Sequence, residues 1–205
     1  MSTPQSAPGP QPDAKPLRAD AARNRLKVLD AARAAFAEHG PNAQMDDIAR
    51  RAGVGVGTVY RHFPTKQALA QAMMEQRVDQ IVTFIRTEML PDPDPWRALA
   101  RSLEFCGTMQ EQDRGYAEAV ASVAGGTSVG GGMKEAGPAQ IEQMFALTAV
   151  FLERAHAAGV VRADLTAADM SPIYTGLSAV VLAGIPDWRR YVEILLDGLR
   201  PQPDR

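Results

Sequence analysis

The sequence predicts an all-α protein with two parts, a small three-helix domain near the N-terminus and a larger helical domain behind it. Apolar side chains recur every three or four residues along most of the 205-residue chain, which is the period of one face of a helix. Glycine and proline interrupt this period at intervals of about one helix length. No segment alternates convincingly between apolar and polar residues as a half-buried strand would.

Composition allows a substantial core, and the charge is distributed unevenly. Hydrophobic residues form 45% of the chain, which is enough to build such a core. The net charge is −2, yet residues 1–66 carry 10 Lys and Arg against 6 Asp and Glu, whereas residues 67–205 carry 12 against 18. A basic first segment on an acidic remainder is typical of a protein in which one domain alone meets phosphate.

Cysteine content and the first residues indicate an intracellular, cytoplasmic protein. Cys106 is the single cysteine, so no intrachain disulfide can form. It lies on an apolar stripe, where a core role is expected and a redox-sensing role is the alternative. Residues 1–19 lack the apolar segment of a secretory signal, and their five prolines predict a disordered tail.

The predicted N-terminal domain comprises residues 20–65. Its first helix is ended by His39-Gly40-Pro41. The apolar positions of that helix, at helical spacing, are Leu26, Leu29, Ala32, Ala35 and Phe36. A second helix, Met45–Ala52, carries acidic residues in its first turn and stops at Gly53 in a left-handed cap. A third short helix runs from residue 56 or 57 to 63.

The larger domain is predicted to span residues 66–200. Thr65 caps a long helix, Lys66–Leu90, which connects the two domains. Prolines at positions 91, 93 and 95 then break the chain. Further helices are predicted over residues 96–106, 116–124, 138–158, about 168–185 and 187–199, with a glycine-rich loop over 125–132.

The block from Met45 to Lys66 has the pattern of a helix-turn-helix, whose second helix enters the DNA major groove. Gly53 and Gly55 allow a sharp turn and a close approach to phosphate. Thr58 and Tyr60 are hydrogen-bond donors suited to phosphates and base edges. The candidate DNA-contacting residues are Gln44, Met45, Gly55, Val56, Gly57, Thr58, Tyr60, Arg61, His62 and Lys66.

This block resembles the TetR family of bacterial regulators. The matching residues are Ile48-Ala49, Ala52-Gly53-Val54, Gly57-Thr58, Tyr60, His62-Phe63 and Lys66, preceded by the family-like helix ending Phe36-Ala37-Glu38-His39-Gly40. The resemblance covers about residues 20–75, and farther along it is architectural only. Gly55 and Gln44 depart from the serine and the serine or threonine common in the family, which concerns two phosphate contacts and not the fold.

The resemblance implies a homodimer that joins through its last two helices and binds a palindromic double-stranded DNA operator. Residues 170–186 are uncharged and residues 187–199 have a broad apolar face, which together would expose too much hydrophobic surface on a monomer. A membrane span is a weaker alternative, since the uncharged stretch is shorter than the roughly 20 apolar residues needed. The candidate interface residues are Ile173, Leu177, Val181, Trp188, Tyr191, Leu195 and Leu199.

The resemblance also implies a small-molecule effector bound in the larger domain. Methionine and aromatic side chains suit an adaptable pocket, so the effector is expected to be largely apolar. The candidate pocket residues are Met73, Phe105, Met109, Tyr116, Met133, Met144, Phe145 and Tyr174. Ordinary core packing is the alternative for each of them, and the loop over 125–132 is a candidate lid over the cavity.

The sequence does not favour an enzyme. It holds no paired carboxylates, Ser-His-Asp set or metal-ligand cluster, so no catalytic residue, metal or cofactor is predicted. Gly53-x-Gly-x-Gly57 is not interpreted as a nucleotide-binding loop because no strand precedes it. The function predicted is a ligand-responsive repressor that its effector releases from the operator. An activator or an architectural DNA-binding protein is the alternative, and a helical enzyme or carrier is the least favoured.

Overall fold

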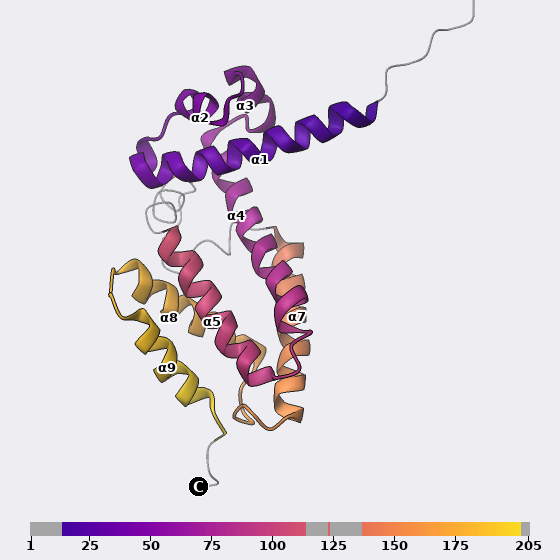
Figure 1. Ribbon diagram of the computed structural model, residues 1–205, viewed down its shortest axis with the longest axis vertical. Helices are drawn as coiled ribbons and strands as arrows, with labels where there is room; N and C mark the ends of the chain where they lie inside the picture. Colours follow the sequence, from indigo (N-terminus) through magenta and orange to yellow (C-terminus); the bar gives the residue numbers. More distant parts are fainter. Residues whose placement is uncertain (1–13, 114–122, 124–136, 202–205) are drawn as a thin grey trace, which may run out of the picture.

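The computed structural model describes residues 14–113, 123 and 137–201, and every regular element within them is helical. Helix α1 (Ala14–His39) lies across one end of the molecule, with two short helices on its outer side (Figure 1). A long helix leads from this end into a second group of helices. The all-α class and its division into a three-helix N-terminal part and a larger helical part are therefore confirmed.

Helix α1 begins earlier than the sequence predicted. Residues 14–19, expected to be disordered, form its first turns. Pro16 is compatible with this because it lies in the first turn, where a backbone N–H needs no acceptor within the helix. The remaining part of the predicted tail, residues 1–13, lies outside the described residues.

The buried stripe of α1 also differs from the predicted one at a single position. Leu26 is 51% exposed, because the stripe runs through Val28 and Leu29 and continues to Phe36, each at most 1% exposed. Ala32 and Ala35 are buried as predicted. After α1, one turn of 3-10 helix over Gly40–Asn42 leads to the next element.

The two short helices lie close to the predicted bounds, α2 at Met45–Ala52 and α3 at Val56–His62. Gly53 between them has φ 67°, the left-handed conformation that glycine adopts without steric cost. The N–H of Val54 donates to the carbonyl of Ala49 over 3.1 Å, which completes a Schellman ending of α2. The turn that sets the angle between α2 and α3 is therefore encoded locally.

The connecting helix α4 (Lys66–Phe84) continues into one π-helical stretch over Ile85–Met89, so the predicted long helix is present. Its start is fixed by Thr65, whose hydroxyl accepts the N–H of Ala68 over 3.0 Å. The π-helical stretch widens the helix where it approaches the proline-rich turn.

Helix α4 contributes to two separate hydrophobic cores. The N-terminal core combines α1, α2 and α3 with five residues of α4, which are Leu69, Ala70, Ala72, Met73 and Met74. The C-terminal core includes the next apolar positions of the same helix, which are Val78, Val82, Ile85 and Met89. One continuous helix therefore belongs to both cores.

The other described helices of the larger domain are α5 (Pro95–Gln112), α7 (Pro138–Ala157), α8 (Ala167–Leu182) and α9 (Trp188–Leu199). In Figure 1, α4, α5 and α7 form one group, and α8 and α9 lie beside α5. The helix predicted over 116–124 and the loop over 125–132 lie outside the described residues, apart from the helical Val123. None of the helices described here is long and apolar enough to cross a membrane.

Helix α8 ends earlier than its predicted stop at Pro186. The last helical residue is Leu182, and Gly184 turns the chain with φ 76° before the proline is reached. At the other end, Thr166 and Asp169 form a capping box, in which the Asp169 carboxylate accepts the N–H of Thr166 over 2.8 Å.

The proline-rich turn before α5 is held by buried Asp92. Arg97 donates to its carboxylate from Nε over 3.1 Å and from a terminal guanidinium nitrogen over 2.6 Å, and Arg154 of α7 donates to its carbonyl over 2.8 Å. The hydrogen bonds from Arg97, followed by that from the N–H of Asp94, lower the pKa of Asp92 to about 2. This turn is therefore joined to the start of α5 through the Asp92 carboxylate and to α7 through the Asp92 backbone carbonyl.

A second close contact joins α5 to α9. Trp188 is 1% exposed and lies against Gly107, where an added Cβ would come within 2.3 Å of the indole ring. Tyr174 of α8 is joined to Ser102 of α5 by a hydrogen bond of 2.7 Å between the two hydroxyls. The absence of a side chain at residue 107 therefore allows Trp188 to pack directly on the α5 backbone.

We predict that Asp92→Asn makes the thermal stability of the protein less dependent on pH at acidic pH. The pKa of folded Asp92 lies below its ordinary value of 3.8, so its contribution is present above that value and is lost as the pH falls toward 2. The Tm of the wild type should thus fall more steeply between pH 4 and pH 2 than the Tm of Asp92→Asn. Asp94→Asn is the control, since asparagine caps a helix as well as aspartate does. Parallel profiles for Asp92→Asn and wild type would contradict this role.

We also predict that Gly107→Ala lowers the free energy of unfolding by about 1–3 kcal/mol, because the methyl group overlaps the Trp188 ring. The matched control is Gly198→Ala in α9, where an added Cβ meets nothing within 4 Å. That variant should gain about 0.5–1 kcal/mol from helix propensity. Urea unfolding of the two variants checks both signs, and equal effects would refute the proposed overlap.

Candidate nucleic-acid interface

Helix α3 has one buried face and one exposed face. Val59 and Phe63 are at most 2% exposed and belong to the N-terminal core. On the other side, Val56 is 39% exposed and Tyr60 is 45% exposed, and Arg61 is exposed as well. The core thus orients α3, which lies on the outer side of α1 (Figure 1), so that Val56, Tyr60 and Arg61 are exposed.

Two glycines at the start of α3 are not required by packing within the chain. A Cβ added at Gly57 would meet nothing within 4 Å, and one at Gly55 would meet only the Thr58 hydroxyl at 3.9 Å. Glycine inside a helix costs about 0.5–1 kcal/mol relative to alanine. This cost applies to Gly57, which lies inside α3, and not to Gly55, which is its N-cap.

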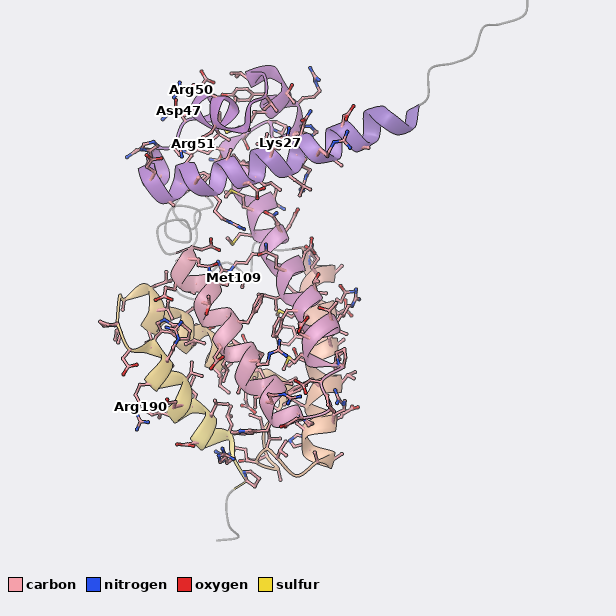
Figure 2. The ribbon with its side chains drawn as sticks, in the orientation of Figure 1. Lys27, Asp47, Arg50, Arg51, Met109 and Arg190 are labelled. Atoms are coloured by element: carbon pink, nitrogen blue, oxygen red, sulfur yellow. The ribbon has the colours of Figure 1, made fainter. Side chains whose placement is uncertain are left out.

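Helix α2 is held to the end of α1 by charged side chains that Figure 2 labels. Arg51 forms an ion pair with Glu38 of α1, and Arg50 forms one with Asp47 within α2 at 2.5 Å. The side chain of Arg50 is 80% exposed, so it is available to a further anionic partner. The Arg51–Glu38 pair therefore adds one contact between α2 and α1 to the packing of Ile48 and Ala49 in the core, and Arg50 leaves positive charge on the outer surface.

Lys66 differs from the prediction that it grips a DNA backbone. Its ammonium donates to the carbonyl of Pro41 and lies 5.6 Å from the centre of the Phe36 ring. Partial burial lowers the pKa of Lys66. The side chain therefore ties the start of α4 to the turn before α2, and any DNA contact from it would be shared with this internal bond.

Three other predicted contacts have internal partners. Met45 is 8% exposed and lies in the N-terminal core, so its side chain cannot read DNA, and this prediction is wrong for the side chain. Gln44 is exposed, but its amide donates to the Asn42 carbonyl over 2.8 Å and does not cap α2. His62 is half-buried, with its ring 6.1 Å from that of Phe63.

A second candidate site is a cleft of about 710 Å³ between α4 and α5. Its lining residues are Arg33, Gln76, Asp79, Gln80, Thr83, Phe84, Thr87, Glu88, Phe105, Thr108, Met109, Gln112 and Asp113. Two aromatic rings within it, Phe84 and Phe105, are stacked with centroids 4.2 Å apart. The labelled Met109 lies toward the end of α5 nearest α1 (Figure 2).

The predicted ligand residues separate into four groups. Phe105 and Met109 line the cleft. Met73 belongs to the N-terminal core, which is incompatible with a pocket in the larger domain. Met144, Phe145 and Tyr174 pack in the C-terminal core instead, and Tyr116 and Met133 lie outside the described residues.

The cleft was missed because its lining is mainly polar, whereas the sequence search used methionine and aromatic residues. A polar stripe could have revealed it. Gln76, Gln80, Thr83 and Thr87 recur at spacings of three and four on the long connecting helix, where a buried apolar face would otherwise continue.

The predicted interface residues are largely occupied within the chain. Leu177, Val181, Trp188 and Leu199 are each at most 6% exposed and lie in the cores, so the prediction that their side chains meet a partner is wrong. Ile173, Tyr191 and Leu195 are half-buried. The apolar side chains that remain exposed in this region are Ile185 at 48% and Ile194 at 55%.

Cys106 packs against the group of buried residues around Trp188. Burial raises the pKa of its thiol to about 12, which disfavours the reactive thiolate. The structure therefore favours the core role over the redox role.

Comparison with known proteins identifies the family. Residues 28–73 match the model of bacterial regulatory proteins of the tetR family. Residues 94–201, more than half of the chain, match the C-terminal domain of SbtR-like transcriptional regulators. The protein belongs to the TetR family. It is accordingly a helix-turn-helix transcriptional regulator that binds DNA and is not an enzyme.

Solved TetR-family structures agree with this assignment along most of the chain. A TetR regulatory protein from Mycobacterium vanbaalenii is 40% identical, with 90% of this chain and 99% of that chain covered and a TM-score of 0.67. A TetR regulator from Streptomyces coelicolor is 30% identical, with 87% and 99% covered and a TM-score of 0.64. The regulator FadR from Bacillus subtilis shares the fold at 16% identity, with 84% and 95% covered and a TM-score of 0.61.

Curated HTH-type transcriptional regulators match over a short part of the chain. An HTH-type transcriptional regulator of Staphylococcus aureus strain MRSA252 is 50% identical over 54 residues, which are 26% of this chain and 27% of the relative. A second regulator, from strain USA300, is 35% identical over 71 residues, which are 34% and 38% of the two chains. The matched part thus spans well under half the length of these curated relatives.

For this TetR-family protein we predict that Gly57→Ala separates stability from DNA binding. The methyl group should raise the free energy of unfolding by about 0.5–1 kcal/mol, because it meets no protein atom. It should weaken DNA binding, because it occupies the space that the partner approaches. Fluorescence anisotropy with a selected operator and urea unfolding measure the two effects. Unchanged DNA affinity would remove residue 57 from the contact surface.

In the same assay, Thr58→Ala and Tyr60→Phe should each weaken operator binding by about 1–3 kcal/mol while leaving the fold intact. Both hydroxyls lie on the face of α3 that carries Gly57, and neither has a side-chain partner needed for the core. Arg23→Met, an exposed change on α1, is a control for loss of charge alone. Operator affinity equal to wild type in both hydroxyl variants would exclude these groups as contacts.

Proposed function

We propose that this regulator is a homodimeric repressor that leaves its operator when a small-molecule effector binds between α4 and α5. The outer face of α3 carries the DNA-binding part of the proposal. There the exposed Tyr60 and the half-exposed Thr58 flank Gly57, around which no protein atom lies. Such a surface combines hydrogen-bond donors with backbone that a DNA strand can approach closely.

The contacts divide by chemistry. Thr58 and Tyr60 donate to phosphates or base edges, and the exposed guanidinium groups of Arg50 and Arg61 neutralise phosphates. Lys66 supports these contacts from inside by holding the turn at Pro41. The basic balance of the first 66 residues adds a long-range attraction to DNA.

The proposed dimer joins α8 and α9 to the same helices of a second copy. Ile185 and Ile194 are exposed apolar residues beside these helices, and Leu195 is half-buried next to them. Two-fold symmetry would place the two α3 helices on successive major grooves, roughly 34 Å apart.

The effector site is the cleft between α4 and α5. Most of its lining residues are polar and surround two stacked aromatic rings, so the ligand we propose carries polar groups around an apolar, aromatic part. FadR from Bacillus subtilis, which has the same fold, was crystallised with stearoyl-CoA, which supports ligand binding by this architecture. Because α4 belongs to both cores, an effector against its C-terminal half would shift α3 and change the spacing of the two copies.

An activator or an architectural protein without an effector is the competing function. The cleft favours the ligand-responsive protein, since an architectural protein has no use for a cavity of this size.

The proposal is tested by selecting fragments of the source genome that bind the purified protein. We expect a palindromic operator, bound by two chains, to be enriched. A screen of small molecules against that complex should then identify compounds that release it. Failure to enrich any sequence, or an operator complex that no compound releases, would contradict the repressor function.

For the dimer we predict that Ile194→Asp lowers the molecular mass in sedimentation from two chains to one. The charge would be placed on a side chain that is 55% exposed, so the fold of the monomer should be retained. Val150→Asp is the matched control, since Val150 is 47% exposed and lies on a different helix, α7. A dimer that persists in Ile194→Asp and dissociates in Val150→Asp would move the interface to α7.

A further inference from the structure

The cleft between α4 and α5 ends at an ion pair that joins the two domains. Arg33 of α1 and Asp113 at the end of α5 both line it, with Arg33 Nε 3.5 Å from the Asp113 carboxylate. Arg33 belongs to the helix on which α2 and α3 pack, whereas Asp113 follows a helix of the larger domain. A molecule in this end of the cleft therefore touches the contact between the domains.

The two partners of this ion pair are held with different strength. Asp113 is 5% exposed and also accepts a hydrogen bond of 3.1 Å from Arg77, which in turn donates to buried Gln110. The side chain of Arg33 is 30% exposed, against 14% for that of Arg77. Asp113 is thus fixed within the larger domain, and Arg33 is the more exposed of the two arginines that contact it.

The rest of the cleft favours positive charge next to a flat ring. Asp79, Glu88 and Asp113 line it as carboxylates, and Arg33 is the single cationic side chain among its lining residues. Glu88 is paired with Arg101 at 2.9 Å outside the lining. The rings of Phe84 and Phe105, 7° from parallel, offer a face for an aromatic or cationic group.

We propose that this cleft binds an organic cation with a flat aromatic body. The charged group of that ligand replaces Arg33 as the ion-pair partner of the Asp113 carboxylate. The aromatic body lies on the Phe84 and Phe105 side, and the cation reaches the far end. Loss of the ion pair frees α1 from α5, so α2 and α3 move relative to the larger domain. The inference rests on the proposed function for its consequence at the operator, but binding itself does not depend on DNA.

Three probes with one aromatic body test the charge preference. They are 1-pyrenemethylammonium, neutral 1-pyrenemethanol and 1-pyrenecarboxylate, each followed by fluorescence anisotropy with the full chain and no DNA. We expect the cation to bind about tenfold more tightly than the carboxylate, with the alcohol between them, because three carboxylates line the cleft. Equal affinities for the three probes, or no binding of the cation, would overturn the proposal.

Variants of the ion pair test the competition. Arg33→Met removes the competing arginine, so the affinity for the cation should rise by about threefold. Asp113→Asn should lower the affinity for the cation by about tenfold and change the affinity for the alcohol little. Arg23→Met, the same substitution on an exposed part of α1, should leave all three affinities unchanged. Weaker binding of the cation to Arg33→Met would overturn the proposal. The measurement on Arg33→Met remains decisive even if Asp113→Asn does not fold.

A final measurement separates this inference from the proposed function. The cation should release the selected operator from the wild type, whereas Arg33→Met, whose ion pair is already absent, should bind that operator weakly with or without the cation. Operator binding by a protein that ignores the pyrene series would refute the cleft chemistry and leave the repressor intact. Preferential binding of the cation by a protein that selects no operator would support the cleft chemistry and refute the repressor function.

Discussion

The structure depends on the packing of one helix, α4, in two hydrophobic cores. Its first half closes the three-helix core with Leu69 and Met73, and its second half enters the other core with Val78 and Val82. Rotation or translation of a helix is opposed by every side chain packed along it. The orientation of α3 is therefore a property of the whole chain, although the turn before it is formed by local hydrogen bonds.

Between the two cores the contacts become polar. Arg77 follows the last residue of the N-terminal core on α4 by only three positions, and its hydrogen bonds go to Gln110 and Asp113 on α5. Polar contacts exchange partners at lower cost than close-packed apolar side chains do, because a ligand or water can replace each bond. The junction between the two cores is thus joined by hydrogen bonds and ion pairs, whereas each core is packed by apolar side chains.

The sequence predicted the N-terminal domain in detail because its signals are local. Gly53 and Thr65 each fix a helix boundary through backbone conformation or a cap within a few residues, and both appear as expected. Val181 and Trp188 show the limit, because their pattern is equally consistent with burial by the chain itself and burial by a partner. Choosing between these requires the positions of α5 and α8, which no short-range pattern contains.

The cleft illustrates the same limit for a site. Its residues come from α1, α4 and α5, and Arg33 and Asp113 meet although 80 positions separate them in sequence. No rule of spacing connects two charged residues at such a distance. The polar stripe on α4 was present in the sequence, but it identifies one wall and not the chemistry opposite.

The space around Gly57 has a consequence for how proteins with this architecture diverge. Val56 and Tyr60 on the outer side of α3 are exposed, and a Cβ added at Gly57 would meet nothing within 4 Å, whereas Val59 and Phe63 on the inner side are buried in the core. Substitutions outside can therefore accumulate with little effect on folding, while those inside are restricted to apolar residues of similar size. A lineage can acquire a new DNA target by changing a few exposed positions, and its scaffold need not change with it.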